Sequence, residues 1–259
     1  MKHYHFFLAL ILLVALLLPV GCGNPPDDNN GIPKAAIVDQ LYLLEPNPSF
    51  IAEATQMLET AGFKVDVWQG ADITVDFYRK LSTMGYRFIL FRVHSGVLLQ
   101  LKGEEVVEMK NTYFFTSENY TSTRYVADQL SDKVSYAIMA ENSPNIFAVN
   151  SEFFKDAKGN YNRTVILAMG CESYRYDDLP IAFVEKGASA YIGWSGVVTL
   201  EHVDKVTLDL LKNLCIGGMP IADAVSVTMT DLGPDPYFDS FLKIYPQESG
   251  SQTVNELIK

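Results

Sequence analysis

An α/β fold is predicted from this sequence, with a mostly parallel β-sheet covered by helices on both faces in three αβα layers. From residue 35 onward, short apolar segments alternate with segments whose apolar residues recur at helical spacing. Two of the apolar segments, 88–93 and 164–169, carry almost no polar residue. Strand–helix alternation is typical of a parallel sheet, and a strand that is apolar throughout indicates cover on both faces. We assign this domain to residues 35–245.

The first four elements of the domain follow from local patterns. Residues 35–41 form a short apolar segment, which is typical of a buried strand. Apolar residues at helical spacing follow from Ser49, and Gly62 ends that helix. Residues 63–68 alternate as a second strand, and residues 74–84 predict a second helix. The third strand is the apolar segment noted above.

The second half of the domain repeats the alternation. Residues 177–186 have the spacing of a helix, and residues 188–194 predict the next strand. Residues 199–215 predict a long helix, which a pair of glycines ends. These elements complete a chain of strands joined by helical crossovers.

The stretch 98–162 interrupts this rhythm. It holds short β-like pieces and a turn cluster at 141–145. The expected pieces are 106–109, 112–116, 135–139 and 146–149. We interpret the stretch as an insertion between the two central strands, which could wall a site or carry a mobile loop. Residues 246–259 are polar and are expected to form a loosely held tail.

The N-terminus has the pattern of an export signal. The apolar run 6–18 is uncharged and too short for a comfortable membrane span, but it fits a secretory signal over residues 1–22. Cys22 follows a small residue and resembles the lipidated cysteine of bacterial lipoproteins, although Pro19 replaces the leucine usual in that motif. Residues 23–34 then form a polar tether. The sequence predicts an exported protein held at the cell membrane by a lipid on Cys22. The alternative is an ordinary cleaved signal that happens to contain a cysteine.

Composition restricts the possible partners. The net charge is −11 and 48% of the residues are hydrophobic, which describes a globular chain. No basic stripe is present, so nucleic acid is excluded as an expected partner. No glycine-rich phosphate loop and no zinc-type spacing occurs, so neither a cofactor nor a metal is expected. Cys215 is interpreted as a small buried hydrophobe, with a disulfide to Cys171 as the alternative.

Two residues capable of covalent chemistry close the two most apolar strands. His94 follows the strand 88–93, and Cys171 follows the strand 164–169 after one glycine. Since the carboxyl ends of parallel strands meet at one edge of a sheet, both residues are expected where ligands bind. A thiol nucleophile requires such an imidazole partner. The turn at Ser95 and Gly96 could present backbone N–H groups to an oxyanion.

The residues around this pair resemble the caspase-like fold of cysteine peptidases, the group of caspases, legumain, gingipains and clostripain. Val93-His94-Ser95-Gly96 and Gly170-Cys171-Glu172-Ser173 match the two catalytic turns of that family. Cys-Glu-Ser is similar to the legumain version, and the segment 186–196 is similar to the gingipain continuation. The resemblance implies cleavage of peptide or protein substrates, with Cys171 as nucleophile and His94 as general acid/base.

The sequence also departs from that family. Many members have an acid or glutamine two residues before the cysteine, where this chain has Met169, and a glycine directly after the histidine, where it has Ser95. We name Asp39, Met169, Trp194 and Ser195 as candidate residues of the substrate pocket. For Asp39, the sequence favours a turn cap over the pocket role.

Two alternatives to catalysis remain open. The first is an inactive caspase-like relative, and the second is another α/β surface lipoprotein; either would bind a peptide or protein partner without covalent chemistry. In both, His94 bonds a loop and Cys171 is ordinary packing.

The anchor provides the first testable expectation. Cys22→Ser should release the protein from membranes or block its maturation, because one thiol carries the lipid. Membrane fractionation and the mass of the mature N-terminus measure this. A Ser variant that matures and fractionates as the parent does would refute lipidation.

Overall fold

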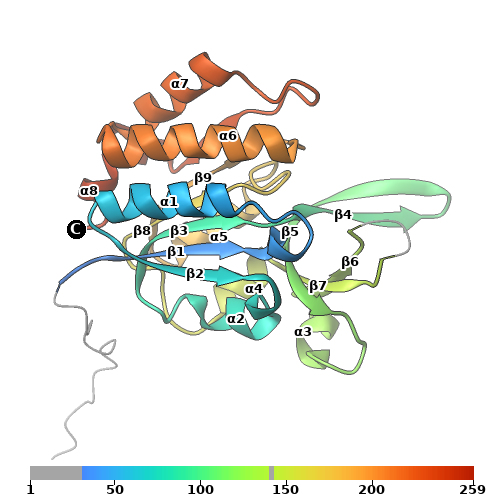
Figure 1. The fold of residues 1–259 in the computed structure, drawn as a ribbon. Helices are drawn as coiled ribbons and strands as arrows, with labels where there is room; N and C mark the ends of the chain where they lie inside the picture. Colours follow the sequence, from blue (N-terminus) through green and yellow to red (C-terminus); the bar gives the residue numbers. More distant parts are fainter. Residues whose placement is uncertain (1–30, 140–142) are drawn as a thin grey trace, which may run out of the picture.

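The computed structural model describes residues 31–139 and 143–259 (Figure 1). The expected signal peptide, the Cys22 anchor and residues 23–30 of the tether lie outside these residues. Within the described part of the chain, no helix is both long and apolar enough to cross a membrane.

A six-stranded sheet forms the centre of the fold, in the order β10-β9-β8-β3-β1-β2. Five of its strands are parallel, and only β10 runs antiparallel, beside β9. The mostly parallel sheet predicted from the alternating segments is therefore confirmed. The strands are β1 (Lys34–Asp39), β2 (Lys64–Gln69), β3 (Tyr86–Arg92), β8 (Thr164–Ala168), β9 (Ala188–Trp194) and β10 (Leu242–Tyr245).

Helices pack on both faces of this sheet, and successive residues of each central strand face opposite ways. In β1, for example, Ile37 belongs to one apolar cluster and Val38 to the other. The first cluster contains side chains of α1 (Pro48–Thr60), α6 (Leu200–Leu211) and α7 (Ile221–Leu232). The second contains side chains of α2 (Val75–Leu81), α4 (Ser151–Asp156) and α5 (Asp178–Glu185). This double cover explains why the central strands are apolar throughout.

The insertion forms a second, antiparallel sheet in the order β4-β5-β7-β6, which extends beyond the edge of the main sheet (Figure 1). It starts at Ser95, three residues earlier than expected, and the pieces 106–109 and 112–116 belong to one long strand. The polar residues between them had suggested a break, but they are exposed or half-buried on a projecting hairpin. The elements are β4 (Ser95–Lys102), β5 (Glu105–Asn119), α3 (Val126–Leu130), β6 (Val134–Ala137) and β7 (Ile146–Asn150).

The C-terminal segment is packed rather than loosely held, which corrects the expectation for residues 246–259. A 3₁₀ turn (Gln247–Ser251) leads into α8 (Val254–Leu257), where Thr253 and Glu256 form a reciprocal capping box. Val254 and Leu257, three residues apart on one helix face, are buried in the first apolar cluster. Three aliphatic residues (Val254, Leu257 and Ile258) within a polar stretch were too few to predict this contact.

Three further one-turn elements complete the fold. They are the 3₁₀ turns Gln40–Leu43 and Gly70–Asp72, and a π-helical turn at Lys212–Ile216 that ends α6. The π turn carries Cys215, which packs against the first apolar cluster but is partly rather than fully buried. Cys171 and Cys215 are both free thiols, so the alternative disulfide is excluded.

Packing of the C-terminal helix has a measurable consequence. Leu257→Ala should lower the free energy of unfolding by about 2 kcal/mol or more, because it removes a buried side chain from the core. Denaturant unfolding measures the loss, and Asn255→Ala, at an exposed position of the same helix, is the control. Equal stability of the two variants would mean that the tail does not contribute to the core.

Candidate functional site

His94 and Cys171 stand level with each other at the carboxyl edge of the main sheet. β3 and β8 are adjacent and parallel, with Phe91 opposite Ala168. The Met169 N–H donates to the Phe91 carbonyl at 2.9 Å, so the pairing continues past the end of β8. His94 and Cys171 each follow three residues after this paired position. The register therefore agrees with the expectation that His94 and Cys171 lie at the same edge of the sheet.

A close backbone contact holds the two strand ends together. The Ser95 hydroxyl donates to the Cys171 carbonyl at 2.5 Å. A Cβ atom on Gly170 would lie 2.1 Å from the Ser95 Oγ atom and 2.7 Å from the Val93 carbonyl oxygen. Only glycine fits there, so the thiol-bearing turn can approach the histidine-bearing turn this closely.

Both residues line one hollow of about 220 Å³. Gly170 contributes backbone, and Glu45, which is exposed, contributes the single carboxylate of the lining. The remaining walls are apolar and come from strand ends, the turn after β1 and the start of α6. They are Leu41, Val93, Met169, Val198, Leu200 and Val203. A thiol and an imidazole therefore share a mainly apolar space.

The Cys171 thiol is partly buried and protonated at rest. Burial raises its pKa above the usual value, and the charge of the neighbouring Glu172 acts in the same direction. The thiol donates to the Val198 carbonyl, with a sulfur–oxygen distance of 3.4 Å. The backbone N–H of Cys171 has no acceptor among the described residues apart from its own sulfur, so it is available to an incoming oxygen.

His94 is held by its backbone and by its surroundings. Its N–H donates to the side-chain oxygen of Gln40 at 2.9 Å, and its carbonyl accepts from the Phe115 N–H. The imidazole ring lies 6.2 Å from the Phe115 ring, centroid to centroid. Burial lowers its pKa, an effect that Glu45 opposes and Arg92 reinforces. The ring nitrogens bond no other group in the described part of the chain, and the lowered pKa favours the neutral form of the ring.

A buried ion network lies directly beside this pair. Arg92, the last residue of β3, is fully buried and pairs with Asp39 at 2.9 Å and with both carboxylate oxygens of Asp204 at 3.0 Å. Its guanidinium also donates to the Glu45 carbonyl at 3.0 Å. Asp39 is therefore a partner of Arg92 and does not line the hollow, contrary to its nomination as a pocket residue. A charged residue at the end of an apolar strand was the available signal for this network, since a buried arginine requires acidic partners.

Two other candidate pocket residues lie elsewhere. Trp194 is 1% exposed and packs in the first apolar cluster. Ser195 exchanges hydrogen bonds with the Phe241 backbone, accepting at its hydroxyl and donating from its N–H. Neither belongs to the lining of the hollow, which reaches instead to Val198 and α6. Met169 alone among the four candidates lines it.

The turn expected to present oxyanion donors, at Ser95 and Gly96, forms the start of β4. The Ser95 side chain bonds the Cys171 carbonyl, so it joins the two turns rather than facing a ligand. Gly96 lies in β4 and lines a separate groove of about 360 Å³ together with Phe115. Glu172 has a left-handed backbone, with φ of 57°, and its carboxylate accepts from the Val97 N–H at 3.2 Å. These contacts fasten the second sheet to the turn after Cys171.

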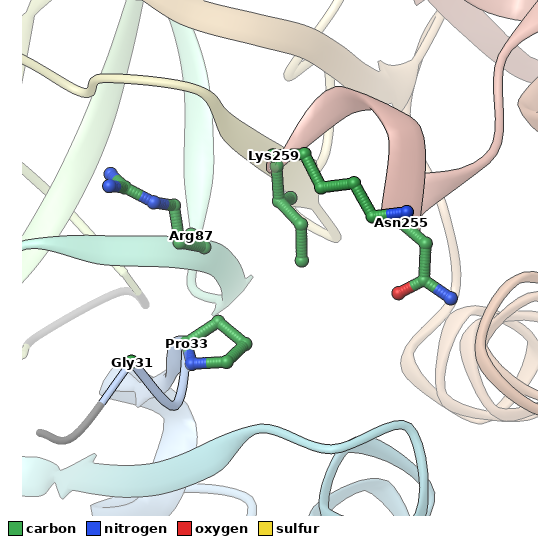
Figure 2. Close-up of a pocket in the computed structure, with 6 residues that line it drawn as sticks. Gly31, Pro33, Arg87, Asn255 and Lys259 are labelled. Carbon is green, nitrogen blue, oxygen red and sulfur yellow. The ribbon is translucent and has the colours of Figure 1, made fainter.

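A larger hollow of about 420 Å³ lies at the opposite, amino-terminal edge of the main sheet. Figure 2 shows Arg87, Lys259 and Asn255 around it, with Gly31 and Pro33 at its side. Its lining residues include no thiol and no imidazole. Among the described residues there is also no group of three or more histidine, cysteine or acidic side chains placed to hold a metal ion.

Comparison with known proteins gave no assignment. A scan of the chain against protein-family models found no match, and a search of curated proteins found no significant one. The chemistry of the hollow therefore has to be argued from its own residues.

The two free thiols should respond differently to alkylation. Iodoacetamide modification of Cys171 should accelerate as the pH rises above 9, because the thiolate is the reacting form and burial raises the thiol pKa. Cys215, whose pKa burial raises to about 12, should react only after unfolding. Peptide mass spectrometry measures both sites. A rate plateau for Cys171 below pH 7 that His94→Ala abolishes would instead indicate a thiolate–imidazolium pair.

Proposed function

We propose that this protein is a cysteine peptidase in which Cys171 and His94 form a catalytic dyad. The observation that carries the proposal is the shared hollow: a thiol and a neutral imidazole, at the same level of adjacent parallel strands, face one space large enough for a side chain. We assign the domain to the caspase-like class on the same ground, together with the helices on both faces of a mostly parallel sheet.

The proposed reaction begins from the neutral pair. His94 accepts the thiol proton as the Cys171 sulfur attacks the carbonyl carbon of the substrate, and the backbone N–H of Cys171 donates to the resulting oxyanion. The imidazolium then gives its proton to the leaving amine, which departs as the carbonyl re-forms in a thioester. Water attacks the thioester while His94 takes its proton, and the proton returns to the sulfur as the acid product leaves. His94 thus acts first as base and then as acid in each half of the reaction, and it ends neutral.

We further propose that the protein is exported and anchored to the cell membrane by a lipid on Cys22, with a peptide or protein as its substrate. The apolar run 6–18, which ends close to Cys22, supports export. The net charge of −11 argues against a nucleic-acid substrate.

Peptide binding without catalysis is the second candidate function. Two observations favour it: the thiol pKa is raised rather than lowered, and no third side chain in the described residues orients the His94 ring. In that case the hollow would hold an apolar side chain of a partner, and the thiol would act as one wall.

Substitution of the dyad distinguishes the two functions. Cys171→Ala should abolish cleavage of a mixed fluorogenic peptide library without loss of fold, and His94→Ala should lower turnover by about 100-fold or more, the usual scale for a positioned acid/base. Cys215→Ala is the matched control, and it should retain cleavage while losing some stability. The readouts are initial rates and circular dichroism.

A different pair of results would refute the peptidase proposal. If the parent cleaves nothing and a peptidyl chloromethyl ketone leaves Cys171 unlabelled, the peptidase proposal fails. Unchanged peptide affinity in Cys171→Ala, measured by calorimetry, would then favour the binding function.

A further inference from the structure

We infer that the hollow beside Cys171 selects an uncharged, apolar side chain, of the size of leucine or methionine, on the residue whose carbonyl carbon is attacked. This inference rests on the proposed function, because it assigns the substrate preference of the same site. It names Met169, Leu200 and Val203 as specificity-determining residues.

The size of the hollow indicates a single side chain. Its volume of about 220 Å³ is below the roughly 300–1,000 Å³ of pockets that hold whole drug-sized ligands. Cys171 and His94 belong to its walls, so a side chain inside it brings the carbonyl of its own residue to the sulfur. The hollow therefore receives the residue directly before the cleaved bond.

The chemistry of the walls excludes a charged side chain. Met169 is 2% exposed and Val203 is 3% exposed, and both belong to the first apolar cluster. A carboxylate entering this space would lose its water and find no lysine or arginine among the lining residues, and burial disfavours the charged form of His94. A lysine or arginine would meet one carboxylate, Glu45, which is exposed and therefore screened by water.

The surface around the hollow is also rich in exposed apolar side chains. The turn after β1 presents Tyr42, Leu43 and Leu44, which are 43–59% exposed, next to the wall residue Leu41. On the other side, the segment after Trp194 is hydrogen-bonded to the loop that bears the exposed aromatic residues Tyr237, Phe238 and Phe241. Large exposed apolar side chains beside a site commonly mark a binding surface. Apolar residues next to the cleaved bond would gain contacts there.

A peptide series tests the inference. Fluorogenic peptides identical except for the residue before the cleaved bond should be cleaved with kcat/KM at least about 100-fold higher for Leu or Met than for Lys, Arg, Asp or Asn. Glu45→Gln should increase the ratio of kcat/KM for the Leu peptide to that for the Lys peptide, because it removes the one carboxylate that could pair with a cationic side chain. A parent enzyme that prefers Lys or Arg, and loses this preference in Glu45→Gln, would overturn the inference while leaving the peptidase proposal intact.

A charge placed inside the hollow provides the converse test. Met169→Glu should lower cleavage after Leu and raise cleavage after Lys and Arg relative to the parent, whereas Met169→Leu should keep the parent ranking. Because a buried glutamate can prevent folding, Leu200→Phe is the second variant; by narrowing the hollow it should shift the preference from Leu toward Ala. An unchanged ranking in both folded variants would overturn the inference. Chloromethyl ketones bearing Leu, Lys or Asp separate the failures, because absence of labelling at Cys171 by all three overturns the peptidase proposal together with the inference.

Discussion

The buried guanidinium of Arg92 is the interaction on which the carboxyl edge of the sheet depends. It joins four parts of the chain: Asp39 at the end of β1, Asp204 on α6, the Glu45 carbonyl before α1, and β3 itself. Removing the cation would leave two carboxylates without a counter-charge inside the fold, a loss of about 3–5 kcal/mol for a buried pair. These are also the segments that wall the hollow, so its shape is set by an ion network that no ligand needs to touch.

The hollow is also mainly apolar, which affects both the Cys171 thiol and the His94 imidazole. Burial favours the uncharged form of each, so the thiol keeps its proton and the imidazole stays free to accept one. The same burial that lowers resting reactivity strengthens every dipole around a developing charge. In the proposed peptidase, such a pair would be unreactive in the free protein and would react only when a substrate delivers its carbonyl. The contact between Ser95 and the Cys171 carbonyl keeps the two strand ends in the register that such a response requires.

The sequence was informative where one local pattern determined the structure. Uniformly apolar strands predicted the covered parallel sheet, and the positions of His94 and Cys171 after two such strands predicted their meeting at one edge. The walls of the hollow could not be predicted, because Leu41, Leu200 and Val203 come from segments distant in the chain. Asp39 and Arg92 each carried a signal, but their pairing depends on the order of β1 and β3 in the sheet. Trp194 and Ser195 were named as pocket residues in a segment similar to the gingipain continuation, and such a similarity does not fix the side-chain direction.

Residue 31 and the hollow beside Cys171 lie at opposite edges of the main sheet. Gly31 and Pro33 lie beside the C-terminal residues Asn255 and Lys259, at the edge where β1 begins (Figure 2). The six residues of β1 span about 20 Å before the chain reaches the opposite edge with its hollow. Any surface joined through residue 31 would consequently stand behind the domain, with the thiol directed outward. A display format or immobilised biosensor that attaches the domain at residue 31 or at Lys259 would leave the edge with Cys171 unobstructed.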